Sequence, residues 1–404
     1  MCYAISMPRF HPFAGLRYDP ARVDLSMVIS PPYDVVDPAE RDVLAGRHSA
    51  NSVRIELPEA DHRAGLDRYA NAARQLADWQ SAGTLVRDPA PALYVYRMTT
   101  PAGAVTTGVI GALDVDTEGS SDVLPHEQTL PKPRSDRLDL LRATGANLSP
   151  IWGLSLAAGL TGEFTPVGPA ASSATDDDGV HHELWVLDDP DAVARVAEAV
   201  SASPVVIADG HHRYETARQF AGEVGATGGP LSAGAASVMA LVVELAEDQL
   251  TVGAFHRVLS ELPDGLDLVD VFASWFDVTR AGEFDDRTTS ALGESGAFSL
   301  LMPSGAWLLS PKDGTAEAAG SDLDASTVAL VIAELPDHEL EFVHTWSDAV
   351  AAVGSDRAQA AVLLRPATVG QIAEWARAGR RMPPKTTYFF PKPRTGMVFR
   401  TLAG

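Results

Sequence analysis

The pentapeptide Asp-Gly-His-His-Arg at residues 209–213 gathers a carboxylate, two imidazoles and a guanidinium in one place. The β-branched run Val205–Ile207 before it predicts a buried strand, and apolar residues at helical spacing after it predict a helix. A glycine at the join allows a sharp turn and the close approach of a ligand, and the first turn of a helix presents unpaired N–H groups. The pattern therefore predicts an anion site at a strand-to-helix corner, suited to a phosphate. An aspartate N-cap without any ligand fits the pentapeptide equally well.

A second stretch places acid–base groups among prolines. His126, Glu127 and Lys132 lie in a segment that prolines bound on both sides. Such a segment is irregular and rigid, which is a common setting for catalytic groups. An exposed charged loop has the same composition, so this stretch alone leaves both interpretations open.

A third stretch, near the end of the sequence, combines lysine with threonine. Lysine is scarce in this chain, which otherwise uses arginine, yet Lys385 is followed directly by Thr386 and Thr387. A lysine supplies a compact point charge, and two hydroxyl groups beside it can bind a phosphate. The stretch is therefore a candidate second phosphate clamp, with chance placement as the alternative.

Several motifs of other enzyme classes are missing from the sequence. No lysine follows a glycine, so the P-loop pattern is absent, and no Gly-x-Gly-x-x-Gly follows a predicted strand. Adjacent histidines diverge and lack the spacing of a helical zinc site, and there is no Gly-x-Ser-x-Gly elbow for a serine nucleophile. The chemistry that remains is phosphoryl transfer, which needs a phosphate cradle, a cation and a carboxylate that takes the acceptor's proton.

Composition limits the class of protein further. A chain of 404 residues with 46% hydrophobic residues is long enough for two or three domains with a substantial core. A net charge of −23 and the lack of a basic block argue against nucleic acid as the main ligand. Cys2 is the one cysteine, so no intrachain disulfide is possible, and no apolar run reaches the ~20 residues that cross a bilayer. We therefore expect a soluble cytoplasmic protein that binds neither nucleic acid nor membrane.

The predicted elements indicate an α+β fold. Within residues 1–117, the pattern predicts a strand at Asn51–Leu57, a helix at Gly65–Trp79 and strands at Leu93–Met98 and Val105–Val115. The proline-rich loop at residues 30–36 of this segment is interpreted as structural.

Two stretches farther along also lead to definite expectations. Residues Ser237–Leu245 and Leu250–Phe255 predict a hairpin that leads into the basic pair His256 and Arg257. The run Asp176–Asp178 lacks the spacing of a calcium loop and predicts a solvated loop.

Three motifs, in their order along the chain, resemble those of the free serine kinases of the ParB/sulfiredoxin-like superfamily. They are Pro-His-Glu-Gln at 125–128, Asp-Gly-His-His-Arg at 209–213 and Pro-Lys-Thr-Thr at 384–387. Nearly the whole chain resembles a bacterial family labelled SpoOJ/ParA/ParB/RepB, through Ser-Pro-Pro-Tyr-Asp at 30–34 and the longer forms of the same motifs. The resemblance implies a ParB/sulfiredoxin-like catalytic module at residues 118–404, with a sub-boundary near 262, and an added N-terminal α+β segment at 1–117.

The resemblance also implies roles for individual residues. It implies an enzyme that phosphorylates L-serine to O-phosphoserine, with ATP or ADP as donor and Mg²⁺ as cofactor. Glu127 would be the catalytic base, and Asp209 would position the metal or the acceptor. The expected phosphate-binding residues are Gly210, His211, His212, Arg213, Lys385, Thr386 and Thr387. The expected substrate-binding residues are His126, Lys132 and Arg257.

Two other functions use the same motifs. A ParB-like protein could bind and hydrolyse a nucleotide as a switch that controls partner binding, and a phosphatase could run the phosphoserine reaction in the opposite direction. The sequence leaves the donor nucleotide, the direction of the reaction, the oligomeric state and the role of the N-terminal segment open.

Overall fold

The computed structural model describes residues 8–115, 122–125, 127, 135–226 and 228–403. The chain forms two compact units: the first comprises Met1–Thr251 with Pro391–Gly404, and the second comprises Val252–Phe390. Each unit has its own sheet and its own buried apolar cluster. Both units mix helices with strands, which confirms the α+β prediction.

The division into units differs from the boundary predicted at residue 117. Strands β4 (Leu93–Thr99) and β5 (Val105–Asp114) precede that residue, yet they pair with β10 (His181–Leu187) and β12 (Ser237–Glu244), which follow it. Because β5 is buried between β4 and β12, the N-terminal segment completes the sheet of the first unit and does not form a domain of its own. The sub-boundary predicted near residue 262 lies close to the division after Thr251.

The first unit is built on one large mixed sheet. Besides the strands already named, the unit contains β1 (Phe10–His11), β2 (Leu16–Tyr18), β3 (Leu85–Arg87), β6 (Val123–Pro125), β7 (Ala146–Asn147), β8 (Ile151–Ser155), β9 (Ser172–Thr175), β11 (Val205–Asp209) and β21 (Arg400–Thr401). Strands β2 and β3 form a separate pair, as do β7 and β21. The order of the main sheet is β6-β11-β8-β12-β5-β4-β10-β9, with β1 beside β5. Since β6 and β11 are parallel neighbours, the segments that follow them leave the sheet at the same end.

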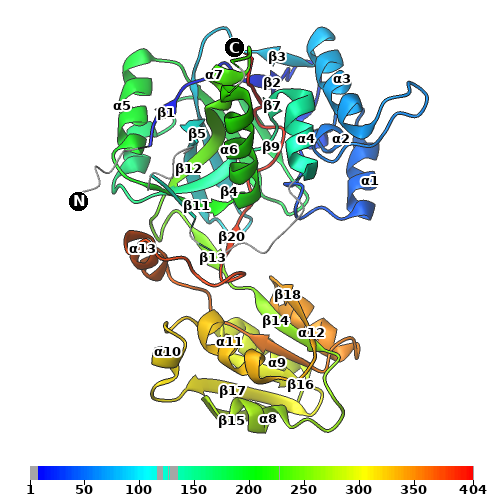
Figure 1. Ribbon diagram of the computed structural model, residues 1–404, viewed down its shortest axis with the longest axis vertical. Helices are drawn as coiled ribbons and strands as arrows, with labels where there is room; N and C mark the ends of the chain where they lie inside the picture. Colours follow the sequence, from blue (N-terminus) through cyan, green and yellow to red (C-terminus); the bar gives the residue numbers. More distant parts are fainter. Residues whose placement is uncertain (1–7, 116–121, 126, 128–134, 227, 404) are drawn as a thin grey trace. The chain divides into compact units, whose positions relative to one another are not determined.

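Helices cover this sheet and connect its strands. They are η1 (Leu25–Met27), α1 (Pro38–Arg47), α2 (Val53–Glu56), α3 (Arg68–Ser81), α4 (Ser135–Thr144), η2 (Leu160–Phe164), α5 (Pro190–Ser201), α6 (His211–Gly225) and α7 (Ser232–Ala235). Helix α6 packs on β8 and β12, and α4 packs against both α3 and α6 (Figure 1). Among the described residues, no helix combines the length and the apolar composition that a membrane span requires.

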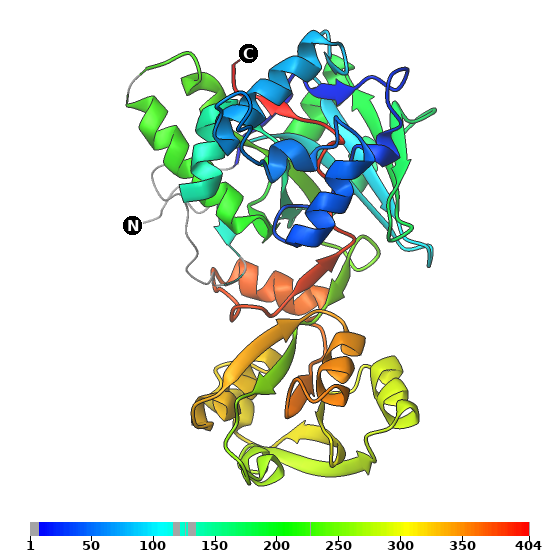
Figure 2. The same ribbon diagram turned by 90° about the vertical axis from the view of Figure 1, so that its right-hand side faces the viewer.

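The C-terminal segment returns to the first unit and packs beside its N-terminal part. Ser30 forms a β-bridge with Thr395, and Leu16 forms one with Phe399, so the red and blue segments lie side by side in Figures 1 and 2. Residues separated by most of the chain length therefore become neighbours. This return carries Pro391–Arg394 into the first unit.

The second unit is a smaller α+β structure. Its strands are β13 (Thr251–Gly253, which begins at the division), β14 (His256–Ser260), β15 (Phe276–Gly282), β16 (Ser299–Met302), β17 (Gly305–Pro311), β18 (Glu339–Val343), β19 (Ala360–Leu363) and β20 (Tyr388–Phe390). Its helices are α8 (Leu268–Phe272), α9 (Asp286–Ser295), α10 (Thr315–Ala318), α11 (Asp324–Glu334), α12 (Trp346–Gly354) and α13 (Val369–Arg377). The main sheet has the order β15-β17-β16-β19-β14-β18, and β13 pairs with β20.

Two predicted elements are wrong. The stretch 51–57 contains the short helix α2 and not a strand, because the Asn51 side chain accepts a hydrogen bond from Val53 N at 3.0 Å and turns the chain. The hairpin predicted after Ser237 does not form, because β12 pairs with β5 and β8 within the large sheet, while β13 pairs with β20.

Candidate functional site

The predicted corner is present in the first unit. Strand β11 ends at Asp209, Gly210 turns the chain with φ +86°, and α6 begins at His211. Val205–Ile207 are almost fully buried, since β11 lies between β6 and β8 and belongs to the same apolar cluster as Tyr214 and Ala217 of α6. The buried strand and the helix therefore fix the position of the Asp209 side chain at the end of the sheet.

The corner requires glycine at position 210 for two reasons. Its φ lies in the left-handed region, and a Cβ there would lie 3.0 Å from Arg213 Nε.

We expect Gly210→Ala to lower the free energy of unfolding by about 1–2 kcal/mol, measured by urea denaturation. Gly222→Ala is the matched control, because Gly222 lies on the same helix with nothing near its Cβ position, and alanine there is expected to stabilise the protein slightly. Equal stability of the two variants would contradict this account of the corner.

Asp209 is held between two cations. Lys392 Nζ donates to Asp209 Oδ1 at 2.5 Å, and Arg213 Nη2 donates to Asp209 Oδ2 at 2.8 Å. All three side chains are at most 15% exposed. Burial raises the pKa of Asp209, but the charges of Lys392 and Arg213 outweigh it and lower that pKa to about 2. Asp209 is therefore ionised at neutral pH, and the three groups together carry a net positive charge.

Lys392 was not among the residues predicted for the site. It reaches Asp209 because the C-terminal segment returns to the first unit, a contact between residues 183 positions apart. Arg394, two residues after Lys392, is held by the aspartate run at 176–178. Its Nε donates to Asp176 Oδ2 at 2.6 Å, and its Nη2 donates to Asp178 Oδ2 at 2.7 Å. The anchored Arg394 helps to fix the Lys392 side chain against Asp209.

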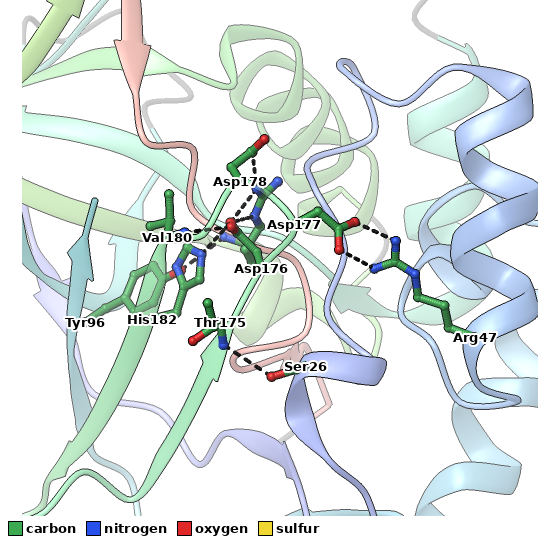
Figure 3. Close-up of polar contacts among 10 residues, drawn as sticks. Ser26, Arg47, Tyr96, Thr175, Asp176, Asp177, Asp178, Val180 and His182 are labelled. Atoms are coloured by element: carbon green, nitrogen blue, oxygen red, sulfur yellow. Dashed lines mark hydrogen bonds and ion pairs between the residues drawn. The ribbon is translucent and has the colours of Figure 1, made fainter. Parts of the chain in front are cut away.

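The aspartate run predicted as a solvated loop contains a buried member. Asp176 is 6% exposed and accepts a hydrogen bond from His182 Nε2 at 2.8 Å, whereas Asp177 points the other way, toward Arg47 (Figure 3). His182 Nδ1 lies 2.7 Å from the Tyr96 hydroxyl group. Burial lowers the pKa of His182, so the neutral ring donates to Asp176 and accepts from Tyr96. The solvated-loop prediction therefore fails at Asp176, because Arg394 and His182 bind it in the interior.

Glu127 lies near the end of the strand beside the corner. Strand β6, which precedes Glu127, pairs in parallel with β11, and Pro125 of β6 lies opposite Ile207 of β11. Glu127 and Asp209 each lie two residues beyond that pair. The two carboxylates therefore follow the same end of two adjacent strands, although they are 82 positions apart in the sequence.

The N-terminal segment contributes side chains close to Arg213. The Arg137 guanidinium stacks on the Tyr33 ring at 4.3 Å from its centroid, and its Nη1 lies 3.6 Å from Glu56 Oε1. Burial raises the pKa of Tyr33 to about 12, against the opposing charges of Arg213 and Arg137. The loop interpreted as structural thus carries Tyr33 to the vicinity of the corner. Sequence reasoning missed Glu56 because its polar side chain is buried in a segment predicted as a strand.

The predicted second clamp lies in the second unit. Lys385 adopts φ +58° and its Nζ lies 4.5 Å from the centroid of the Phe255 ring. Thr386 and Thr387 are buried, and the Thr386 hydroxyl donates to Pro383 O at 2.7 Å. The pairing of this clamp with Asp209 stays a prediction.

The remaining predicted residues have different outcomes. His211 and His212 are half-buried in the first turn of α6, and their contact with phosphate stays a prediction. Arg257 is 3% exposed in the second unit, where its Nη1 donates to Phe255 O at 2.7 Å. These contacts suit a structural role, and its contact with substrate stays a prediction. His126 and Lys132 lie outside the described residues.

Asp209 was predicted to hold Mg²⁺, but each of its carboxylate oxygens is bonded to a cation of the protein. In the part of the chain that the structure describes, no group of three or more His, Cys, Asp and Glu side chains could hold a metal ion. These donors do not fit a metal held by the protein alone.

Comparison with known proteins gives low structural similarity and one family match. Similar solved structures include a conserved hypothetical protein from Pyrococcus furiosus, with 14% identity, a TM-score of 0.38 and coverage of 73% of this chain and 95% of that chain. A free serine kinase in complex with AMP has 15% identity, a TM-score of 0.39 and coverage of 72% and 92%. SbnI with a C-terminal truncation, from Staphylococcus aureus, has 12% identity, a TM-score of 0.39 and coverage of 73% and 88%.

These TM-scores are low, so we assign no residue from them. No curated protein matches the chain. A family model described as "Protein of unknown function (DUF1015)" matches residues 10–329, which is most of the sequence. The chain belongs to the DUF1015 family.

Proposed function

We propose that this protein is a nucleotide-dependent phosphotransferase that phosphorylates the hydroxyl group of a small metabolite, with L-serine as the first candidate. The observation that carries the proposal is the parallel pairing of β6 and β11, since Glu127 follows the first strand and Asp209 ends the second. Two of the three motifs that resemble those of the free serine kinases lie in these stretches, and the resemblance supports the same chemistry.

In the proposed reaction the corner binds the phosphates of the nucleotide. Lys392 and Arg213 provide two positive charges, and the first turn of α6 provides N–H groups. Lys385, Thr386 and Thr387 are the proposed second clamp on the phosphates. Such a cradle stabilises the negative charge that is spread over the transferred phosphoryl group in the transition state.

Glu127 is the proposed general base. Its carboxylate accepts the proton of the acceptor hydroxyl group, and the acceptor oxygen attacks the terminal phosphorus. The bond between this phosphorus and the bridging oxygen breaks, and the shortened nucleotide leaves with the electron pair. The products are the phosphate ester of the acceptor and a nucleotide with one phosphate fewer.

The test is an assay for a phosphorylated product. Purified protein is incubated with ATP or ADP, Mg²⁺ and a panel of hydroxylated amino acids and simple alcohols, and products are identified by phosphorus NMR and mass spectrometry. We expect O-phosphoserine to form together with the matching nucleotide product. A reaction without acceptor is the control: nucleotide hydrolysis there, with no phosphorylated acceptor in the full reaction, would overturn the proposal and favour a nucleotide switch.

A further inference from the structure

A small cavity in the first unit lies beside the corner and has no role in the reaction described so far. Its volume is about 50 Å³, and apolar side chains from α4, β7 and β12 form part of its wall. Its polar lining consists of Glu56, Arg137, Asn147, Ser149, Arg213 and Thr216. Because Arg213 also binds Asp209, one guanidinium is shared between the corner and the cavity.

Glu56 is the unusual member of this lining. Its side chain is 4% exposed, and its Oε1 accepts a hydrogen bond from the Ser149 hydroxyl at 3.1 Å. Its Oε2 is buried and has no hydrogen-bond partner among the described residues. A buried carboxylate oxygen without a donor is costly, and native proteins rarely tolerate one without a functional reason. The atom is therefore a candidate acceptor for a donor that a ligand supplies.

The charges around the cavity indicate what kind of ligand fits. One carboxylate and two guanidinium groups line the same space. Both guanidiniums are fixed by other contacts: Arg137 Nη2 donates to Asp136 Oδ2 at 2.6 Å, and Arg213 Nη1 donates to Pro150 O. A rigid lining with both signs of charge is complementary to a zwitterion, which carries an ammonium donor and a carboxylate acceptor.

The size of the cavity limits that ligand. A cavity of about 50 Å³ holds roughly three to five water-sized groups, since one buried water needs about 10–15 Å³ by the same measure. This space matches the ammonium group, the α-carbon and the carboxylate that all α-amino acids share.

We propose that this cavity binds the small α-amino acid that serves as acceptor, and that Glu56 Oε2 accepts a hydrogen bond from its ammonium group. The assignment rests on the proposed function, because the shared Arg213 places the bound amino acid next to the phosphate site. It gives the N-terminal segment a role, since Glu56 belongs to α2: that segment selects an amino acid over an alcohol without an amino group.

The decisive experiment measures binding without nucleotide. Isothermal titration calorimetry compares L-serine with L-glycerate, which replaces the ammonium group by a hydroxyl, on wild type and on Glu56→Gln. Hydrogen bonds to charged groups give discrimination of about 10- to 100-fold, so we expect wild type to prefer L-serine by this factor. Glu56→Gln is expected to lose this preference, whereas Glu56→Asp, which keeps the charge, retains part of it.

Glu198→Gln is the matched control, because Glu198 is exposed on α5 in the same unit and is absent from the cavity lining. It should bind both probes as wild type does. Thermal unfolding establishes whether each variant is folded, and the comparison of the two probes on wild type needs no variant.

Each outcome bears separately on the cavity and on the reaction. Equal affinity of wild type for the two probes, no binding of L-serine, or an unchanged preference in folded Glu56→Gln would overturn the cavity assignment. If phosphoserine still forms in any of these cases, the proposed function stands without the cavity. Selective binding of L-serine with no phosphorylated product under any donor would instead remove the proposed function and leave the amino-acid site.

Discussion

Glu127→Gln is expected to lower the rate of phosphoryl transfer by about 100- to 10,000-fold while nucleotide affinity stays close to that of wild type. Glutamine has nearly the same shape as glutamate but cannot accept the proton of the acceptor hydroxyl. The phosphate-binding groups proposed in the first unit, Arg213 and Lys392, are unchanged in this variant. The loss should therefore appear in kcat and, to a similar degree, in kcat/KM.

The measurement pairs steady-state formation of phosphoserine with calorimetric titration of the nucleotide. Glu163→Gln provides a control at an exposed glutamate of the same unit, in η2, and should leave both quantities unchanged. Wild-type turnover in Glu127→Gln would show that another group is the base. A parallel loss of nucleotide binding would show that Glu127 acts in binding and not in proton transfer.

Local patterns were sufficient to predict most elements that lie around the corner. The apolar run before Asp209 and the helical spacing after Arg213 correspond to β11 and α6. The apolar run predicts β11 correctly because a strand buried between two neighbouring strands requires apolar residues. The helix α2 was missed since Val53 and Ile55 alternate as in a strand, yet both are buried in a single helical turn.

Contacts between distant segments could not be predicted in the same way. Lys392 lies between two prolines, but nothing in its local sequence indicates that it meets Asp209. The same holds for Asp176, whose neighbours Asp177 and Asp178 are exposed as the composition predicts. Sheet pairing and the return of the C-terminal segment decide these contacts, and both depend on tertiary packing.

Lys392→Met is expected to lower the free energy of unfolding at pH 7 by about 3–5 kcal/mol, because it leaves the Asp209 carboxylate buried with one of its two cations missing. Chemical denaturation measures this change. Arg195→Met, at an exposed cation on α5 of the same unit, is the control and should change stability by less than about 0.5 kcal/mol. A small effect of Lys392→Met would mean that the Asp209 pair contributes little to the fold.

The pH dependence of this effect has a definite sign. The pKa of Asp209 is lowered from 3.8 to about 2 in the folded protein, so the pair stabilises the fold fully above the unfolded value and loses that contribution as pH falls toward 2. The stability difference between wild type and Lys392→Met should therefore be largest above about pH 4 and shrink in more acidic solution. A difference that grows below pH 4 would contradict the assignment of Asp209 as the ionised partner.

Asp209→Asn separates the pairing of Lys392 from its proposed contact with phosphate. This variant removes the carboxylate but leaves Lys392 and Arg213 in the corner, so the local charge becomes more positive. We expect nucleotide affinity to be retained or increased in Asp209→Asn and to fall in Lys392→Met. The double variant should be less destabilised than the sum of the two single variants, since it removes both members of the Lys392–Asp209 pair and leaves only Arg213 without its carboxylate partner. If nucleotide affinity instead falls equally in both single variants, Lys392 serves to hold Asp209 in place, and the phosphates are bound by other groups.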